Sequence, residues 1–292
     1  MTEITAGIKS FMRPNICMNT IQYALDAGVD RVLVGCDGPN RFKKIHKKMI
    51  QKFDDRVELF LYPFNLGLSE TRNRLVSETD SKYFFLLDDD YYIPKCALKG
   101  IDFLKRHPDI KIVGFPNFRG IKAGKQHNWC FNMEIKDRKL YIKAPKDLNE
   151  DCIDGKYHFG YNVDVVENCA IMETKVLKEM KWDKKYIIGQ EHEDFYLNMK
   201  YNYPQYKAGV CFNIFAGHDR GEDDLNWDNY SHFRYGDEVE KSKEYFYKKW
   251  NITEYVDRGN MDLHKTYLID RKFKIYTIDR CSHLKWKGWQ GW

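Results

Sequence analysis

The feature that most limits the fold is the alternation of apolar strands and amphipathic helices in the first half of the chain. Residues 4–11 and 29–36 are predicted strands, and residues 15–28 between them carry apolar side chains at helical spacing. The pattern continues through predicted helices at 40–53, 68–79 and 94–107 and predicted strands at 57–63, 83–87 and 110–115. Strands separated by such helices form right-handed crossover units. We therefore expect an α/β fold, Rossmann-like, with a mostly parallel central sheet flanked by helices.

The second half is less regular. The sequence predicts a hairpin near 127–145, and then a strand at 166–174, helices at 175–180 and 191–203, and a strand at 207–218. From about residue 225 the chain is rich in Tyr, Trp and charged residues and is predicted to be helical. We expect one α/β domain over residues 1–225 and a C-terminal helical, aromatic-rich extension over 226–292, packed on that domain.

Composition indicates an ordinary globular protein, with 43% hydrophobic and 31% charged residues. No stretch approaches the roughly 18 uninterrupted apolar residues that span a bilayer, and the start lacks a basic segment followed by an apolar signal core. We expect a cytoplasmic protein with no transmembrane segment. The eight cysteines include no C-x-x-C pair, so neither a zinc knuckle nor a compact disulfide framework is indicated.

The net charge of +5 is concentrated at the C-terminal end, where residues 241–292 hold 12 Lys and Arg against 6 Asp and Glu. A basic, aromatic tail suits contact with an anionic partner, whereas a solvated surface explains the same charge equally simply.

The stretch "KYFFLLDDDYYIP" at 82–94 runs a buried strand into three aspartates. In parallel sheets, ligands bind beyond the carboxyl ends of the strands, where these aspartates lie. Adjacent carboxylates repel, and burying one without a partner is costly. A divalent cation, Mg²⁺ or Mn²⁺, would explain the arrangement. The alternative is a solvent-facing acidic turn that caps the next helix.

Six segments occur in an order that resembles the family 2 nucleotide-sugar glycosyltransferases with the GT-A fold. They are "IKSFMRP" (8–14), "VGCDG" (34–38), "FNLGLSETRN" (64–73), "FLLDDD" (85–90), "GQEHEDFYL" (189–197) and "AGHDR" (216–220). The resemblance covers residues 4–220 and is nearest to β-1,4-N-acetylgalactosaminyltransferase-like members. It implies metal-dependent, inverting transfer of a sugar from a nucleoside-diphosphate sugar, with UDP favoured, to an acceptor hydroxyl.

The resemblance also assigns the nucleotide-sugar contacts. It places Ser10 and Arg13 in the nucleotide pocket and makes Asp37 the acceptor of a hydrogen bond from the uracil imide. Arg72, one turn inside a predicted helix, would reach the diphosphate. A guanidinium offers a fork of donors to phosphate, although a surface salt bridge would also explain Arg13, and an Asp-Gly turn at Asp37 needs no ligand.

Within the aspartate run, the resemblance makes Asp88 a ribose or base contact, with Asp89 beside it, and Asp90 the ligand of Mn²⁺ or Mg²⁺. His218 would be the second protein ligand, although a lone His is more often structural. Such a cation would stabilise the charge that develops on the departing nucleoside diphosphate.

The acidic cluster 191–194 is the predicted source of the base that removes the acceptor proton. Asp194, directly before Phe195, is the first choice and Glu193 the second, while Glu191 is expected to hold the acceptor. An acidic first turn favoured by the helix dipole is the structural alternative.

Two other function classes stay open. Sugar-1-phosphate nucleotidyltransferases also use a parallel sheet and acid-bound Mg²⁺, but "SFMRPNI" lacks the glycines of their phosphate loop. A non-catalytic module would bind sugars or bases on Trp286, Trp289 and Trp292. The same tail, with Lys285 and Lys287, could instead select a glycan or a modified DNA base as the acceptor, or bury its aromatic rings on the main domain.

Overall fold

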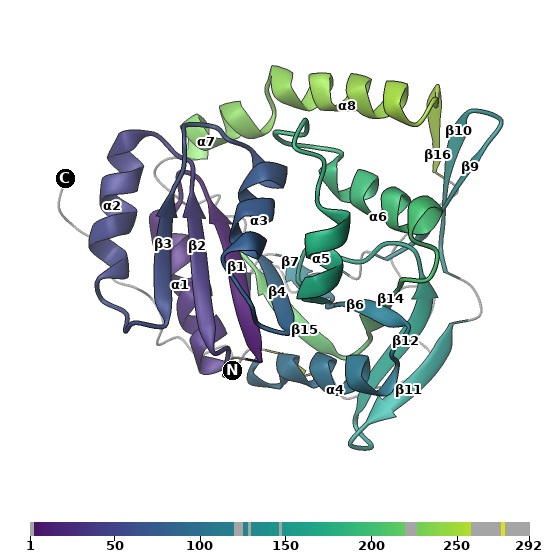
Figure 1. The fold of residues 1–292 in the computed structure, drawn as a ribbon, viewed down its shortest axis with the longest axis horizontal. Helices are drawn as coiled ribbons and strands as arrows, with labels where there is room; N and C mark the ends of the chain where they lie inside the picture. Colours follow the sequence, from purple (N-terminus) through teal and green to yellow (C-terminus); the bar gives the residue numbers. More distant parts are fainter. Residues whose placement is uncertain are drawn as a thin grey trace.

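The computed structural model describes residues 3–119, 125–127, 130–145, 148–219, 227–257 and 276–277. Helices pack on both faces of a central sheet to give three layers (Figure 1). This sheet has nine strands in the order β11-β12-β14-β6-β13-β4-β1-β2-β3. The predicted α/β class is confirmed.

The strands of the central sheet are β1 (Ile4–Ser10), β2 (Arg31–Cys36), β3 (Val57–Leu61), β4 (Tyr83–Asp88), β6 (Ile110–Gly114), β11 (Asn149–Ile153), β12 (Tyr157–Val163), β13 (Ala170–Glu173) and β14 (Lys207–Cys211). The helices are α1 (Pro14–Asp26), α2 (Asn40–Ile50), α3 (Leu68–Ser77), the 3₁₀ helix η1 (Lys95–Leu98), α4 (Lys99–Arg106), α5 (Thr174–Met180), α6 (Glu191–Asn202), α7 (Trp227–Arg234) and α8 (Asp237–Lys249). The remaining strands are β5 (Tyr91–Tyr92), β7 (Asn117–Arg119), β8 (Lys125–His127), β9 (Asn132–Lys136), β10 (Lys139–Lys143), β15 (Ile214–His218), β16 (Glu254–Asp257) and β17 (Tyr276–Thr277).

Strands β3, β2, β1 and β4 run parallel to one another, as the alternating pattern predicts. Strand β13 lies between β4 and β6 and is antiparallel to both, while β14 pairs with β6 in parallel. The carboxyl ends of β1 and β4 therefore lie side by side, with Lys9 paired to Asp88. This register brings the "KSF" and "DDD" segments to one edge of the sheet.

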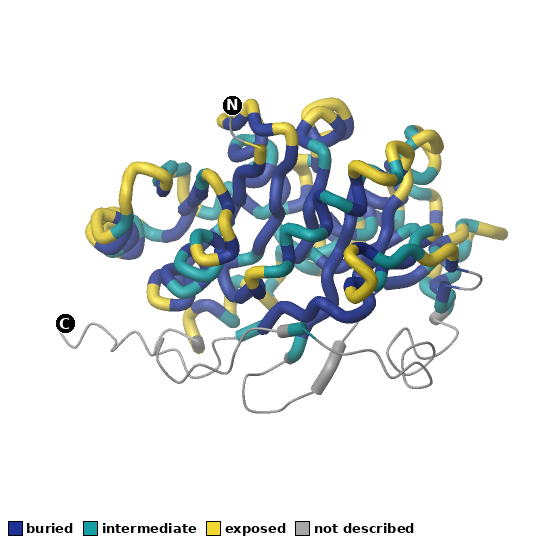
Figure 2. The backbone as a smooth tube through the Cα atoms, turned by 90° about the horizontal axis from the view of Figure 1, so that it is seen from below, coloured by how far each residue is buried: buried dark blue, intermediate teal, exposed yellow. Residues whose placement is uncertain are grey.

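Two apolar clusters hold the layers together. One buries α1, α2 and α4 against the first face of the sheet, and the other buries α3, α5 and α6 against the second. The central strands are buried almost throughout, whereas the outer faces of the helices are exposed (Figure 2). The site at the sheet edge is thus built on a buried apolar core.

The predicted strand at 207–218 is two strands. The break falls at Asn213, whose side-chain oxygen accepts a hydrogen bond from the His158 N–H (2.9 Å) and whose amide donates to the Lys156 carbonyl (2.8 Å). Beyond the break, β15 leaves the central sheet and pairs with β5 and β7. The side chain of Asn213 thus satisfies backbone groups at the bend where the chain turns toward the aspartate run.

The C-terminal segment contributes α7 and α8, as predicted, and both lie along one edge of the molecule, with α8 beside α6 (Figure 1). Phe246 of α8 belongs to the apolar cluster that also contains α6. The hairpin predicted near 127–145 is β9–β10, to which β16 adds in parallel. The Trp-rich end, with Lys285, Lys287 and the three tryptophans, lies outside the described residues.

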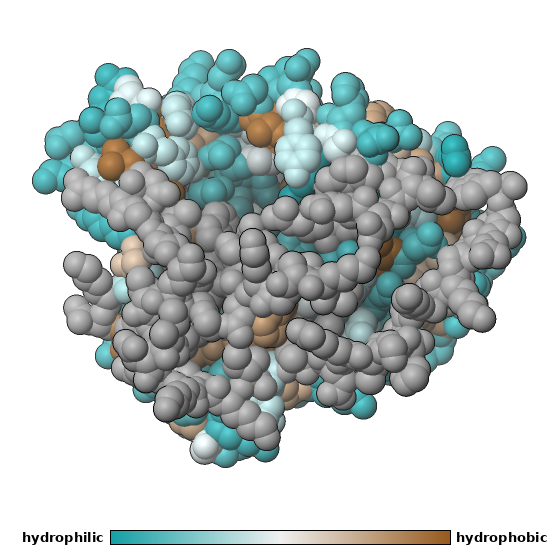
Figure 3. Space-filling model, turned by 180° about the vertical axis from the view of Figure 1, so that it is seen from behind, coloured by the Kyte–Doolittle hydropathy of each residue, from teal (hydrophilic) through white to brown (hydrophobic). Residues whose placement is uncertain are grey.

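On the face seen in Figure 3, the described surface is mostly hydrophilic, with small separate hydrophobic areas. None of the described helices is long and apolar enough to cross a membrane.

Candidate active site

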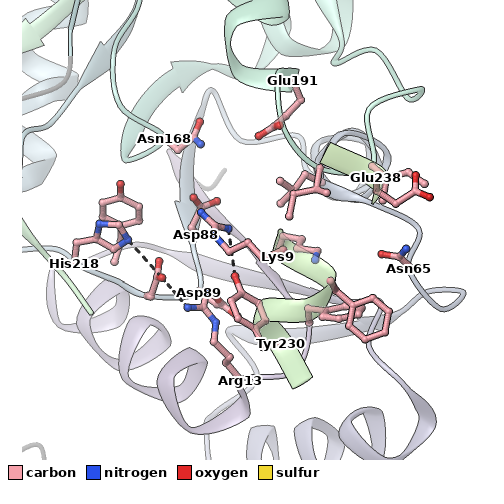
Figure 4. Close-up of a pocket in the computed structure, with 18 of the residues that line it drawn as sticks. Lys9, Arg13, Asn65, Asp88, Asp89, Asn168, Glu191, His218, Tyr230 and Glu238 are labelled. Atoms are coloured by element: carbon pink, nitrogen blue, oxygen red, sulfur yellow. Dashed lines mark hydrogen bonds and ion pairs between the residues drawn. The ribbon is translucent and has the colours of Figure 1, made fainter. Parts of the chain in front are cut away.

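A pocket of about 210 Å³ opens at the carboxyl ends of β1 and β4 (Figure 4). Figure 4 shows Asp88, Asp89 and Arg13 near its centre, with His218 on one side and Tyr230 on helix α7. The lining residues are Lys9, Phe11, Arg13, Asn65, Leu68, Asp88, Asp89, Asp90, Tyr91, Glu167, Asn168, Ile187, Ile188, Glu191, His218, Tyr230, Phe233, Arg234 and Glu238. Segments far apart in the sequence, including all three predicted aspartates, thus meet here.

His218 reaches the aspartates through strand pairing. The short strand β5 follows the aspartates directly and pairs with β15, so that His218 lies opposite Tyr91. Their rings stack at 4.6 Å, and the Asp219 N–H donates to the Asp90 carbonyl (2.9 Å). As a result, the His218 Nε2 lies 3.4 Å from the Asp90 Oδ2.

Each of the three aspartates has a cationic or potentially cationic partner within the protein. Arg13 binds both Asp89 and Asp90, with 2.9 Å to the Asp90 Oδ2, and Arg72 donates to the Asp88 Oδ1 at 2.9 Å. A turn follows β4, so that Asp89 and Asp90 face the same guanidinium and do not alternate in direction. In the sequence, the three adjacent carboxylates suggested a metal ion. In the structure, Arg13 and Arg72 compensate much of this negative charge.

The electrostatics around Asp90 keep it ionised. Burial opposes ionisation, but the charges of Arg13 and His218 hold the pKa of Asp90 well below its ordinary value. Burial likewise opposes protonation of His218, and Asp90 overcomes this effect and raises the pKa of His218. For Asp89, burial prevails over Arg13, and its pKa is raised.

Asp90 and His218 can supply part of a metal site. Their oxygen and imidazole donors suit Mn²⁺ or Mg²⁺, and the buried Nδ1 of His218 has no hydrogen-bond partner. Among the described residues, no three His, Cys, Asp or Glu side chains are grouped so that they could hold a metal ion. These two ligands fit a cation whose remaining positions are filled by phosphate oxygens and water.

Ser10 and Asp37 lie behind the lining of the pocket. The Ser10 hydroxyl donates to the Asp89 Oδ2 (2.9 Å). Asp37 lies 3.1 Å from the Lys9 ammonium and accepts a hydrogen bond from the Gly67 N–H (3.0 Å). Gly67 has φ +97° and a Cβ there would lie 2.7 Å from the Ile187 backbone, so only glycine fits. Asp37 thus fixes two parts of the lining, Lys9 and the loop before α3.

Arg72 is buried and does not line the pocket. Its guanidinium lies between the Asp88 Oδ1 (2.9 Å) and the Glu191 Oε1 (3.4 Å). It therefore links the end of β4 to the start of α6. This contact aligns two pocket carboxylates, whereas the sequence predicts a contact with a diphosphate.

The three acids of α6 point to different surroundings. Glu191 lines the pocket (Figure 4). Asp194 accepts hydrogen bonds from Trp250 Nε1 (2.8 Å) and Tyr186 OH (3.1 Å), and its carboxylate lies 2.8 Å from the Lys249 ammonium. Glu193 lies outside the lining, and burial raises its pKa to about 7. Of the three predicted acids, the structure brings only Glu191 into the pocket.

Sequence reasoning missed the contribution of α7 and α8 to the pocket. Tyr230, Phe233, Arg234 and Glu238 all line it. The Arg13 guanidinium lies 4.3 Å from the centre of the Tyr230 ring, in cation–π contact. No local motif marks these residues, because their position depends on where the two helices pack.

A second missed group comes from the segment before β13. Glu167 is buried and accepts hydrogen bonds from the Asn117 amide (3.1 Å) and the Tyr91 hydroxyl (3.3 Å). Its neighbour Asn168 also lines the pocket, on the same side of Asp88 as Glu191 in Figure 4. The sequence "VENCAIMET" signals only a strand.

The architecture is that of glycosyltransferases with the GT-A fold. The crystal structure of S. aureus TarS 1–349 superposes with a TM-score of 0.51 at 13% identity, covering 76% of this chain and 61% of that chain. The same protein in complex with UDP-GlcNAc gives 0.50 at 14% identity, covering 75% and 60%. This likeness concerns the fold.

The family follows from the sequence comparison. The profile described as Glycosyl transferase family 2 matches residues 17–169, which is more than half of the chain. The chain therefore belongs to glycosyl transferase family 2. It is also 29% identical over 168 residues to the uncharacterized glycosyltransferase MJ1057 of Methanocaldococcus jannaschii. That alignment covers 56% of this chain and 52% of the relative, so the chain spans about half the length of that protein.

Proposed function

We propose that this protein transfers a sugar from a nucleoside-diphosphate sugar to an acceptor hydroxyl, with inversion at the anomeric carbon. The observation that carries the proposal is the convergence of Asp88, Asp90, His218 and Glu191 in one pocket of a family 2 chain. UDP is the favoured nucleotide, because the structurally similar TarS was crystallised with UDP-GlcNAc. The acceptor class is a hydroxyl of a glycan or of a modified DNA base.

Glu191 is the residue we assign as the base. Its carboxylate lines the pocket beside Asp88, and Arg72 holds it in place. Asp194, the first choice from the sequence, is held by Trp250, Tyr186 and Lys249, so its contacts favour a structural role. With one carboxylate acting as base and no second nucleophile assigned, a single displacement that inverts the anomeric carbon is the expected course.

Asp90 and His218 would hold Mn²⁺ or Mg²⁺. When bound, such an ion neutralises charge on the leaving nucleoside diphosphate. Arg13 keeps Asp90 and Asp89 in position, and Ser10 and Asp37 act behind it by ordering the pocket wall. These assignments place the donor diphosphate above the end of β4 and the acceptor toward Glu191.

The test is a panel of nucleotide sugars incubated with Mn²⁺ or Mg²⁺, with released nucleoside diphosphate as the readout. We expect release from one UDP-sugar well above that from the matching GDP-sugar. Product analysis by NMR then gives the anomeric configuration. A folded protein that neither binds nor consumes any donor in the panel would contradict the proposal.

A further inference from the structure

The charges of the pocket pose a problem for an anionic donor, and the inference drawn from them rests on the proposed function. Acidic side chains line the pocket in excess over basic ones. The acids are Asp88, Asp89, Asp90, Glu167, Glu191 and Glu238, and the bases are Lys9, Arg13 and Arg234. A diphosphate entering such a pocket needs a cation that is not already paired with a carboxylate.

Most cations near the pocket are already paired. The Lys9 ammonium lies 3.1 Å from Asp37, and Arg13 binds Asp89 and Asp90. Arg72, behind the lining, bridges Asp88 and Glu191. These side chains hold the architecture of the pocket, and using one for phosphate would leave a carboxylate without its partner.

Arg234 differs from these cations because it lines the pocket without an ion pair to a described carboxylate. It is the last residue of α7, it is exposed, and it lines the same pocket. It donates a hydrogen bond to the Tyr230 hydroxyl (3.3 Å), and within the described part of the chain no carboxylate lies within ion-pair distance of it. Its guanidinium therefore keeps most of its donors available to a ligand.

The packing of α7 fixes the place of Arg234. Tyr230 is buried, and its ring stacks against Arg13, which binds Asp89 and Asp90. Because Arg234 donates a hydrogen bond to the Tyr230 hydroxyl, Arg234 is held near these aspartates. Phe233, one helical turn after Tyr230, packs against Phe11 and Phe64, and the ring centres lie 5.3 Å and 5.7 Å away. Phe11 belongs to the segment after β1, so α7 is anchored directly on the predicted nucleotide pocket.

We infer that Arg234 binds the diphosphate of the donor and stabilises the leaving nucleoside diphosphate. As the acceptor oxygen bonds to the anomeric carbon, the bond from that carbon to the β-phosphate oxygen breaks, and its electron pair stays on that oxygen. The acceptor proton passes to the Glu191 carboxylate. Arg234 compensates the negative charge that the phosphate gains, because the planar guanidinium can donate two hydrogen bonds to phosphate oxygens. The C-terminal helices thus complete the donor site.

The test compares Arg234→Gln and Arg234→Lys with Lys243→Gln, which removes an exposed charge of α8 that does not line the pocket. Binding of UDP and of uridine is measured by calorimetry in metal-free buffer and again with Mn²⁺. For R234Q we expect UDP affinity to fall roughly 10- to 100-fold with uridine affinity unchanged. R234K should lose less UDP affinity than R234Q, and the UDP affinity of K243Q should equal that of the wild type.

The outcomes separate this inference from the proposed function. If the wild type binds no nucleotide and consumes no donor, the proposed function fails and this inference fails with it. If the wild type binds UDP and R234Q binds it equally well, only the role of Arg234 is refuted. Equal losses for UDP and uridine would mean that Arg234 merely supports the packing of α7, and would also overturn the inference. A parallel fall in kcat for R234Q, partly restored in R234K, supports the role in leaving-group departure.

Discussion

The two acidic clusters, residues 88–90 and 191–194, look alike in the sequence but are used differently in the structure. The first follows a strand, and its three carboxylates all lie at one pocket, paired with Arg72, Arg13 and His218. The second opens a helix, and its acids separate into the pocket, an interface with α8, and a half-buried position outside the lining. Position in the fold, and not composition, decides what a run of acids can do.

The difference has a geometric cause. A strand ending at a sheet edge delivers consecutive residues to the same edge, and the turn after β4 lets Asp89 and Asp90 share Arg13. Successive residues of a helix are rotated by about 100°, so Glu193 points away from Glu191. Asp194 lies one turn from Glu191 on a neighbouring part of the helix surface, but Lys249 and Trp250 hold its carboxylate. A cluster at a helix start therefore contains residues with separate roles, and substitutions can separate them.

The largest expected effect is on Glu191. Glu191→Gln keeps the shape of the side chain and removes its capacity to accept a proton, so we expect kcat to fall roughly 10³-fold. Donor binding, measured by UDP calorimetry, should change little. The matched control is Glu193→Gln on the same helix, which should retain activity. A loss of activity in E193Q with E191Q active would reverse the assignment.

A substitution at Asp90 tests the proposed role of the first cluster, residues 88–90, in binding a metal ion. Asp90→Asn removes a ligand charge while keeping a polar side chain, and we expect activity to fall roughly 10²- to 10³-fold. Mn²⁺ binding, followed by electron paramagnetic resonance with UDP present, should weaken in D90N and in His218→Ala. Addition of EDTA should abolish turnover by the wild type. Full turnover in EDTA would remove the metal from the proposal and leave the charge of the diphosphate to the basic side chains of the pocket, Lys9, Arg13 and Arg234.

Asp194 should affect stability more than chemistry. Asp194→Asn leaves Lys249 without one of its two carboxylates, and it weakens the contact between α6 and α8. Loss of a buried charge partner costs about 3 kcal/mol of unfolding free energy. Urea denaturation measures the loss, and kcat per folded molecule should remain close to that of the wild type. Loss of turnover with unchanged stability would restore Asp194 as the base.

Much of the fold was predictable because its determinants are local. Helical spacing and strand runs place the elements of the first half, and parallel topology brings the end of β1 next to the aspartates of β4. The pairing of β5 with β15 then delivers His218, which was predicted only through the family resemblance.

What the sequence did not predict depends on packing between distant segments. Arg72 turns inward because its partners Asp88 and Glu191, 16 and 119 residues away, meet only in the folded chain. Tyr230 and Arg234 enter the pocket because α7 packs on Phe11. Likewise, helical periodicity places Asp194 on a face of α6 but does not say that Trp250 and Lys249 cover that face.

The smallest expected effect on turnover concerns Glu193, whose pKa burial raises to about 7 from an ordinary value of 4.5. Between these two values the unfolded chain loses this proton while the folded chain keeps it, so stability falls as the pH rises. Glu193→Gln cannot ionise. It should therefore match the wild type near pH 4.5 and become more stable by up to about 3 kcal/mol at pH 8. Denaturant midpoints at pH 4.5, 6 and 8 measure this, with the exposed Glu240→Gln as the control. A difference that stays constant with pH would contradict the raised pKa of Glu193.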